Sequence, residues 1–390
     1  MARSPGAIAP DDQNDSDRMD GAPHPREAAE VFGHDEAERA ILEAFASGRM
    51  HHAWLITGPR GIGKATLAWR VARFLLTAPE MDDTSLLGTA APPATLETDP
   101  GHPVARRIAA GGEGRLAVLR RPWAEGDKQP KQEIPVDEVR RLKRFFSLSA
   151  PDGGRRVVIV DSVDDLNKAA ANALLKLLEE PPERTFLLLV SHRPAGLLPT
   201  IRSRCRILRL APLATGDLGR ALRQAGIGQE TENDALAILA AGSVGAAIRL
   251  AGEDGAALYG ELVGLLSQAP GMDRTRAIRF AEKAAGRGAS DPAGTILDLT
   301  EILLGRLARA GIDGPPGSEA APGEARTLAR LSPGSGAARA WAELAQTALD
   351  KARAGRAVNL DPAALVLDML LAIDGTASSV PSPALDPSAA

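Results

Sequence analysis

A glycine-rich loop near the start of the chain has the residue types that bind phosphate. Its sequence is Gly58-Pro59-Arg60-Gly61-Ile62-Gly63-Lys64. Gly58, Gly61 and Gly63 would let the backbone wrap anionic oxygens, and Lys64 would reach the outer phosphates. The residue after the lysine normally holds Mg²⁺ through a hydroxyl, but here it is Ala65. Thr66 does not directly replace it, because one step along a helix is a rotation of about 100°.

A carboxylate at the expected distance after the loop completes a degenerate nucleotide site. Asp161 follows the β-branched run Val157–Val160, which is typical of a strand buried on both faces, so it occupies the Walker B position and would help to hold Mg²⁺. In hydrolysing proteins a glutamate usually follows, whereas this chain has Ser162. Asp164 comes two residues later, where a regular strand exit would aim it wrongly. We therefore expect no independent ATP hydrolysis, while ATP binding by the loop stays open.

The surrounding pattern predicts an α/β fold. The apolar run Ala53–Ile56 precedes the loop and Ala65–Leu76 follows it with helical periodicity, and strand, loop and helix in this order are the context of a phosphate loop. Further strands are predicted at Leu116–Leu119, Thr185–Val190 and Ile207–Leu210. Helices are predicted at Val136–Leu148, with Val139, Leu142 and Phe146 on one face, and at Asn167–Glu180, which Pro181-Pro182 ends. Alternating strands and helices favour a parallel sheet.

Beyond Pro212 the strand signal fades and helices rich in Ala and Leu take over. The last two helices are predicted at Ala337–Ala354 and Pro362–Ile373. A chain of 390 residues is long enough for two or three domains. With 44% hydrophobic but only 3% aromatic residues, their cores must consist mainly of Leu, Val, Ile and Ala.

Several classes of protein are excluded by composition. Cys205 is the only cysteine, which excludes an internal disulfide and a multi-cysteine zinc site and is consistent with a reducing cytoplasm. No apolar run reaches the roughly 18 residues that would span a membrane. The acidic start of the chain has no secretion signal pattern.

One stretch has a clear basic excess. Residues 103–144 contain 11 Lys and Arg against 6 Asp and Glu, a net charge of +5. Two interpretations stay open: a surface that meets DNA phosphates, or a solvated helix face.

Four segments together resemble one family. They are Gly33-His34-Asp35-Glu36-Ala37, then Gly48-Arg49-Met50-His51-His52-Ala53-Trp54-Leu55, then Ala169-Ala170-Ala171-Asn172-Ala173-Leu174-Leu175-Lys176-Leu177-Leu178-Glu179-Glu180-Pro181-Pro182, and Ser203-Arg204-Cys205. With the loop, they resemble the bacterial DNA polymerase III clamp loader, and within it the delta-prime subunits more than the gamma/tau ATPase subunits. The resemblance is strong over residues 26–252 and weaker up to Pro362.

The resemblance implies a domain plan. Residues 26–211 would form an AAA+ nucleotide-binding-like module, residues 212–252 a helical lid and residues 253–375 an all-α collar domain, with disordered tails at 1–25 and 376–390. The collar would join a five-subunit ring that includes gamma/tau ATPase subunits and the delta subunit. That ring opens the sliding clamp and loads it on primed DNA in the cytoplasm.

The resemblance also implies roles for single residues. Arg204 matches the arginine finger, which reaches the γ-phosphate held by a neighbouring subunit. Ser191 matches the first sensor position. Gly245 stands where ATPase subunits have the arginine of the second sensor. The cysteines that form a zinc module in many relatives are missing here, so zinc is not expected.

These patterns predict a clamp-loader subunit without ATPase activity that supplies Arg204 in trans. The predicted nucleotide site comprises Gly58, Gly61, Gly63, Lys64, Thr66 and Asp161. One rival interpretation is an ATP-hydrolysing clamp-loader subunit of the gamma/tau kind, with Thr66 and Asp164 replacing the missing groups. Another is a stand-alone DNA-binding AAA+ protein.

Overall fold

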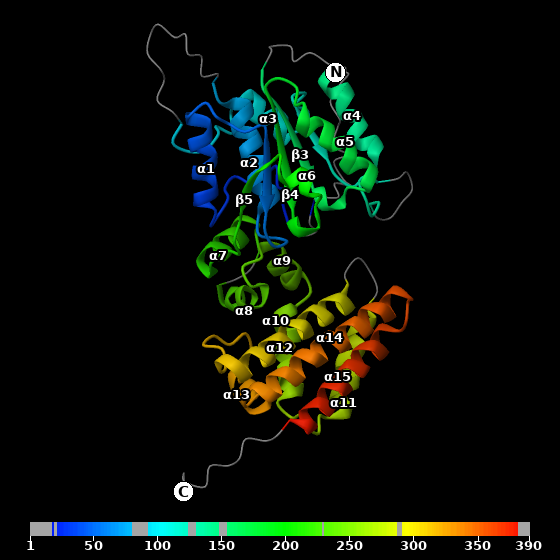
Figure 1. Ribbon diagram of the computed structural model, residues 1–390. Helices are drawn as coiled ribbons and strands as arrows, with labels where there is room; N and C mark the ends of the chain where they lie inside the picture. Colours follow the sequence, from blue (N-terminus) through cyan, green and yellow to red (C-terminus); the bar gives the residue numbers. More distant parts are fainter. Residues whose placement is uncertain are drawn as a thin grey trace. The chain divides into compact units, whose positions relative to one another are not determined.

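The computed structural model describes residue 18 and residues 22–79, 93–123, 130–147, 154–227, 230–286 and 291–380. The chain divides into two compact units (Figure 1). The first comprises Met1–Gly226 and Gly242–Gly245, and the second comprises Ile227–Ala241 and Ala246–Ala390. Most of both predicted tails, residues 80–92, and residues 124–129 of the basic stretch lie outside the described residues.

The first unit is built on a parallel sheet of five strands in the order β2-β3-β4-β1-β5 (Figure 1). The strands are β1 (Ala53–Thr57), β2 (Leu116–Leu119), β3 (Arg156–Asp161), β4 (Thr185–Ser191) and β5 (Arg206–Arg209). The predicted α/β module with a parallel sheet is confirmed. Apolar runs bounded by turns were sufficient to place each strand to within one residue at either end.

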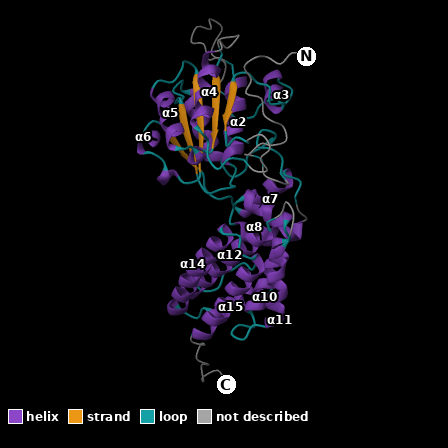
Figure 2. Ribbon diagram, turned by 90° about the vertical axis from the view of Figure 1, so that its right-hand side faces the viewer, coloured by secondary structure: helices purple, strands orange, loops and turns teal. Residues whose placement is uncertain are grey.

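Helices cover both faces of this sheet. The helices of the first unit are α1 (Asp35–Ala46), α2 (Lys64–Thr77), α3 (Pro103–Ala109), α4 (Val136–Ser147), α5 (Lys168–Glu179), α6 (Pro199–Arg202) and α7 (Thr215–Gln224), with 3-10 turns η1 (Val163–Asp165) and η2 (Pro194–Gly196). Side chains of α4, α5 and α6 pack with Leu55, Val158 and Leu187 on one face. Figure 2 shows the strands running between α5 and α2. Burial on both faces explains why the strands are continuously apolar.

Two helices show how local sequence sets their bounds and faces. The side chain of Asn167 caps α5 by accepting a hydrogen bond from Ala170 N at 2.9 Å, and Pro181-Pro182 prevents the helix from continuing past Glu179. In α4, Val139 and Leu142 face the core as predicted. Phe145, which the prediction omitted, is buried beside them, while Phe146 contacts the same core but is only half-buried.

The second unit is helical. Its helices are α8 (Glu230–Ala240), α9 (Val244–Gly252), α10 (Gly255–Leu266), α11 (Arg274–Glu282), α12 (Pro292–Asp313), α13 (Glu324–Leu331), α14 (Ser335–Ala357) and α15 (Pro362–Ser379), with the 3-10 turn η3 (Lys283–Ala285). Leu, Ile, Val and Ala form most of its core, around the buried rings of Tyr259, Phe280 and Trp341. The predicted helical C-terminal region with an aliphatic core is therefore confirmed.

The last helix is longer than predicted. α15 ends at Ser379 instead of Ile373 and so includes the first residues of the predicted C-terminal tail. It is the one helix of the described chain that is long and apolar enough by composition to cross a membrane. Val366, Met369 and Leu370 pack into the core of the second unit, as in a core helix of a folded domain.

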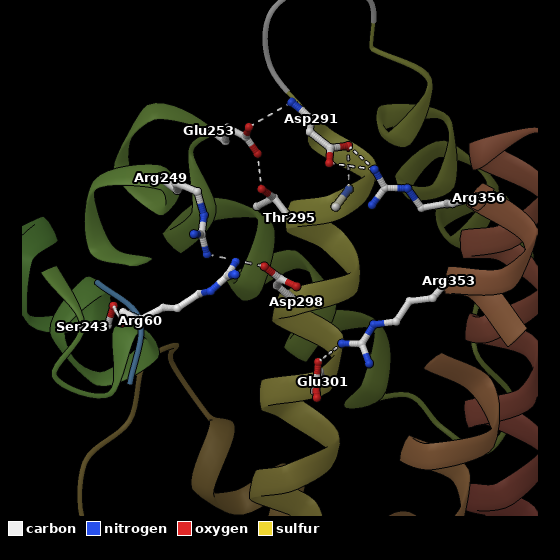
Figure 3. Close-up of polar contacts among 11 residues, drawn as sticks. Arg60, Ser243, Arg249, Glu253, Asp291, Thr295, Asp298, Glu301, Arg353 and Arg356 are labelled. Atoms are coloured by element: carbon white, nitrogen blue, oxygen red, sulfur yellow. Dashed lines mark hydrogen bonds and ion pairs between the residues drawn. The ribbon is translucent and has the colours of Figure 1, made fainter. Parts of the chain in front are cut away.

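Polar contacts tie α9 to α12, and α12 to α14 (Figure 3). Glu253, just after α9, accepts hydrogen bonds from Asp291 N at 3.1 Å and from the hydroxyl of Thr295. Arg249 of α9 lies 3.6 Å from Asp298. Burial raises the pKa of Asp298, and Arg249 opposes that shift. These contacts attach α9 firmly to the long helix of its own unit.

The predicted helical lid, residues 212–252, is divided between the two compact units. The predicted lid at 212–252 contributes α7 to the first unit, and α8 with most of α9 to the second. At the start of the chain, His24 and Arg26 are buried. Arg73 of α2 donates to Arg26 O at 2.5 Å and to Ala28 O at 2.7 Å, so packing begins close to the predicted start of the module. The boundaries at 211/212 and 252/253 stay predictions.

Candidate functional site

The phosphate loop connects β1 to α2 at the carboxyl edge of the sheet. Its three glycines have positive φ angles: 149° at Gly58, 74° at Gly61 and 94° at Gly63. A Cβ on Gly58 would lie 2.5 Å from Leu210 O, and one on Gly61 would lie 2.4 Å from Ser243 Oγ. Neither position can accept a side chain, so the loop shape depends on both glycines. The start of α2 directs its backbone N–H groups to where an anion would bind.

Lys64 turns its ammonium back onto this loop. Nζ donates to Gly58 O at 2.8 Å and to Pro59 O. The residue is 3% exposed, and burial lowers the pKa of the ammonium to about 8, while Asp161 and Asp164 act in the opposite direction. A nucleotide would therefore have to draw Lys64 away from two bonds that the chain already provides.

The next three carbonyl oxygens of the loop also have hydrogen-bond partners elsewhere in the first unit. Arg60 O accepts from Ser243 Oγ at 2.9 Å (Figure 3), Gly61 O accepts from Gly245 N at 2.9 Å, and Ile62 O lies 2.7 Å from His34 Nε2. Five successive carbonyls, from residue 58 to residue 62, thus have partners within the chain. Hydrogen bonds within the chain therefore hold the shape of the loop.

Gly245 has a specific place in this arrangement. The second sensor of an ATPase would put an arginine side chain here, but Gly245 contributes its backbone N–H to the loop. Its Cα would be 3.0 Å from a Cβ on Gly61. Ser243 and Gly245 therefore hold the loop in place through their contacts with its backbone.

The end of β3 has one carboxylate, Asp161, followed by a hydroxyl, Ser162. Asp161 ends β3, is half-buried, and favours the charged form of Lys64. Ser162 follows it, 2% exposed, and its hydroxyl has no hydrogen-bond partner among the described residues. Thr66 lies half-buried in the first turn of α2. Neither hydroxyl can take a proton from water as a carboxylate can.

Asp164 is engaged with the end of β4. Its Oδ1 accepts from Ser191 Oγ at 2.9 Å and from Arg193 N at 3.3 Å, and its Oδ2 accepts from His192 N at 2.5 Å. The hydroxyl at the first sensor position is thus bound to a carboxylate of the same chain. With all three bonds formed, Asp164 links the turn that follows β3 to the end of β4.

Two histidines at the site were missed by the sequence analysis. His34, 4% exposed, contacts the loop carbonyl of Ile62. For His192, burial and the charges of Lys64 and Arg60 lower the imidazole pKa to about 4, so it is neutral at physiological pH. The position of His192 directly after a strand that ends at the sheet edge was the signal that could have identified it.

Arg204 lies at the amino ends of the parallel strands, opposite to the carboxyl ends where the phosphate loop lies. It comes just before β5, and β5 runs parallel to β1 with Arg206 paired to Trp54. The loop begins after Thr57, so a ladder of at least roughly 10 Å separates it from Arg204. The structure therefore brings the loop, Lys64 and Asp161 together but keeps Arg204 away from them.

The surroundings of Arg204 are defined by α5 and α6. Its Nη1 donates to Thr200 O at 3.1 Å and its Nη2 lies 2.8 Å from Glu179 Oε1. The side chain keeps 35% of its surface exposed. Next to it, burial raises the pKa of the Cys205 thiol to about 12, so this cysteine packs as a small apolar residue and is no nucleophile.

Comparisons with known proteins cover mainly the first unit. Residues 33–214 match the family model described as DNA polymerase III, delta subunit. The DNA polymerase III subunit delta' of Pseudomonas aeruginosa is 38% identical over 169 residues, which are 43% of this chain and 46% of that protein. The DNA polymerase III subunit gamma/tau of Mycobacterium tuberculosis is 32% identical over 180 residues, 46% of this chain and 28% of that protein. The chain thus spans less than half the length of these relatives.

A solved structure gives a weaker likeness. It is a DNA polymerase III gamma subunit-related protein from Thermotoga maritima, 14% identical, covering 86% of this chain and 99% of that chain with a TM-score of 0.38. The fold assignment therefore rests on the sheet order described above.

Proposed function

We propose that this chain, whose residues 33–214 match the family model described as DNA polymerase III, delta subunit, is a clamp-loader subunit of the delta-prime kind that hydrolyses no ATP itself. In this proposal it supplies Arg204 to the ATP site of a neighbouring gamma/tau-type subunit. Its further partners would be a delta subunit, the sliding clamp and primed DNA, and it would act in the cytoplasm.

The observation that carries the proposal is the position of Arg204 relative to the chain's own loop. An arginine at the amino edge of the sheet cannot reach a nucleotide bound at the carboxyl edge of the same module. It is exposed and so is available to another molecule. A guanidinium delivered in trans can raise the rate of phosphoryl transfer by about 10³- to 10⁵-fold.

The loop supports the non-catalytic half of the proposal. Ala65 lacks the metal-binding hydroxyl, Ser162 replaces the carboxylate that would orient water, and Gly245 contributes only backbone. Lys64 and Ser191 are bound to groups of the chain itself. Each such loss typically lowers a phosphoryl-transfer rate by orders of magnitude.

The test is reconstitution with the ATPase and clamp-opening subunits. Arg204→Ala should lower hydrolysis at the adjacent ATP site by about 10³-fold or more, so DNA-stimulated ATPase should fall by that site's share and clamp loading should slow. The matched control is Arg202→Ala, which removes a nearby arginine at the end of α6. Unchanged loading by an assembled Arg204→Ala complex would refute the arginine-finger role.

The two rival functions give different results with the purified chain. Turnover of ATP that disappears in Lys64→Ala would favour an ATP-hydrolysing subunit. Strong DNA binding that weakens steeply with salt would favour a stand-alone DNA-binding protein, with the basic stretch 103–144 as its surface.

A further inference from the structure

We propose that Glu179 is a positioning residue for Arg204 and sets the direction in which the guanidinium is presented to a neighbouring subunit. This inference rests on the proposed function and adds a residue to it. Glu179 belongs to one of the four segments that resemble the clamp-loader family, but the sequence alone assigns no role to its carboxylate.

The contact joins two elements that are separate in sequence. Glu179 is the last residue of α5, and Arg204 lies two residues after Arg202, the last residue of α6. Glu179 Oε1 and Arg204 Nη2 are 2.8 Å apart, within the range of a charge-assisted hydrogen bond. The second anchor, Thr200 O at 3.1 Å from Nη1, lies inside α6. Together the two anchors hold one side of the planar guanidinium.

The two side chains belong to a rigid base. Leu178, next to Glu179, is 2% exposed and Ile201 is 1% exposed, and both belong to the core on the α5 face of the sheet. The pair itself lies at the surface, with the side chains of Arg204 and Glu179 exposed by 35% and 48%. The backbone is therefore held by the core, and the ion pair determines only where the guanidinium points.

Charge at the end of α5 favours this pairing. A helix C-terminus has a partial negative charge, so a carboxylate there is unfavourable unless a cation lies close by. Arg204 provides that cation for Glu179 and for the helix end. The attraction keeps the guanidinium beside α5 when no neighbour is bound.

The pair leaves Arg204 able to act. A guanidinium has five N–H donors, and the contacts to Thr200 and Glu179 need only one each. The remaining donors can bind phosphate oxygens while Glu179 stays in place. A free arginine loses much rotamer entropy when it binds the transition state. Because Arg204 is already held in position, it should lose less entropy there and so lower the activation barrier further.

The experiment uses the reconstituted complex with ATPase and clamp-opening subunits. Glu179→Gln should lower the rate of hydrolysis at the adjacent ATP site by about fivefold, the upper end for an exposed ion pair, so kcat of DNA-stimulated ATPase should fall by most of that site's share. KM for ATP and the affinity of assembly should stay unchanged. Glu179→Asp, which keeps the charge, should recover part of the rate. Glu180→Gln is the matched control, because Glu180 is the adjacent exposed glutamate.

A double-mutant cycle separates positioning from general stability. In an Arg204→Ala background, Glu179→Gln should have no further effect on kcat, since its role depends on the guanidinium. Equal losses in both backgrounds, or a normal rate in Glu179→Gln alone, would overturn the inference. If Arg204→Ala itself leaves loading unchanged, the proposed function fails instead, so the two failures are distinguishable.

Discussion

Substitution of Asp164 directly tests whether its hydrogen bonds stabilise the connection between the carboxyl ends of β3 and β4. The change is Asp164→Asn, which keeps the size of the side chain but replaces one carboxylate oxygen by an NH₂ group. Oδ1 can still accept from Ser191 and Arg193, as it does now. The amide nitrogen would face His192 N in this orientation or Arg193 N in the flipped one, so in both orientations one backbone N–H loses its acceptor.

The expected cost follows from these bonds. An unsatisfied donor away from water costs about 1–3 kcal/mol, and losing the charge on the acceptor weakens the other bonds by about 1 kcal/mol. We expect the free energy of opening at the end of β4 to fall by about 2–4 kcal/mol. Hydrogen exchange of the His192 and Arg193 amides should then become roughly 30- to 1,000-fold faster.

The assay is hydrogen exchange read by mass spectrometry, which resolves the two units separately. Peptides of α12 in the second unit serve as an internal reference. The matched control is Asp165→Asn, because Asp165 is the next carboxylate and pairs with Arg121 at 3.6 Å near the surface, a contact worth about 1 kcal/mol or less. Equal exchange in the two variants would refute the structural role of Asp164.

Two further predictions concern buried charges. Glu324 is fully buried in the second unit and bonds to Tyr259 Oη at 2.6 Å and to Arg306 Nε at 2.5 Å. Glu324→Ala should lower the free energy of unfolding by about 3–5 kcal/mol in thermal or urea unfolding. The control is Glu343→Ala, at an exposed position on α14, which should cost under about 1 kcal/mol. The pKa of Lys64 is lowered from 10.5 to about 8, so between these pH values the unfolded chain holds more protons and stability relative to Lys64→Met should rise with pH. A difference that stays flat from pH 8 to 10.5 would contradict the burial of a charged lysine.

The strands and the phosphate loop could be predicted because their signals are local. A β-branched run such as Val157–Val160 and the glycine spacing before Lys64 need no information from distant residues. The bonds to the loop carbonyls could not be predicted, because His34 and Ser243 reach the loop only through the tertiary fold. The same limit applies to Glu179, whose partner Arg204 lies on another element.

The ends and faces of helices were predicted less well. α15 passes the predicted end at Ile373 because its next residues are still compatible with a helix and Ala377 packs into the core. The division of the predicted lid between the two units also depends on contacts such as Glu253 with Thr295. Hydrophobic periodicity identifies the apolar face of a helix but does not reveal which element packs against that face.

The two edges of the parallel sheet give this module a direction. Arg204 stands at one edge and the degenerate loop at the other, so in a row of such modules each would offer an arginine on one side and a loop on the opposite side. Under the proposed function, a neighbour on the Arg204 side gains a complete ATP site, while a neighbour on the loop side finds none to complete. Under the same proposal, this chain would stand at one end of the series of hydrolysing sites, because a site can be completed on its Arg204 side and none can be completed on its loop side.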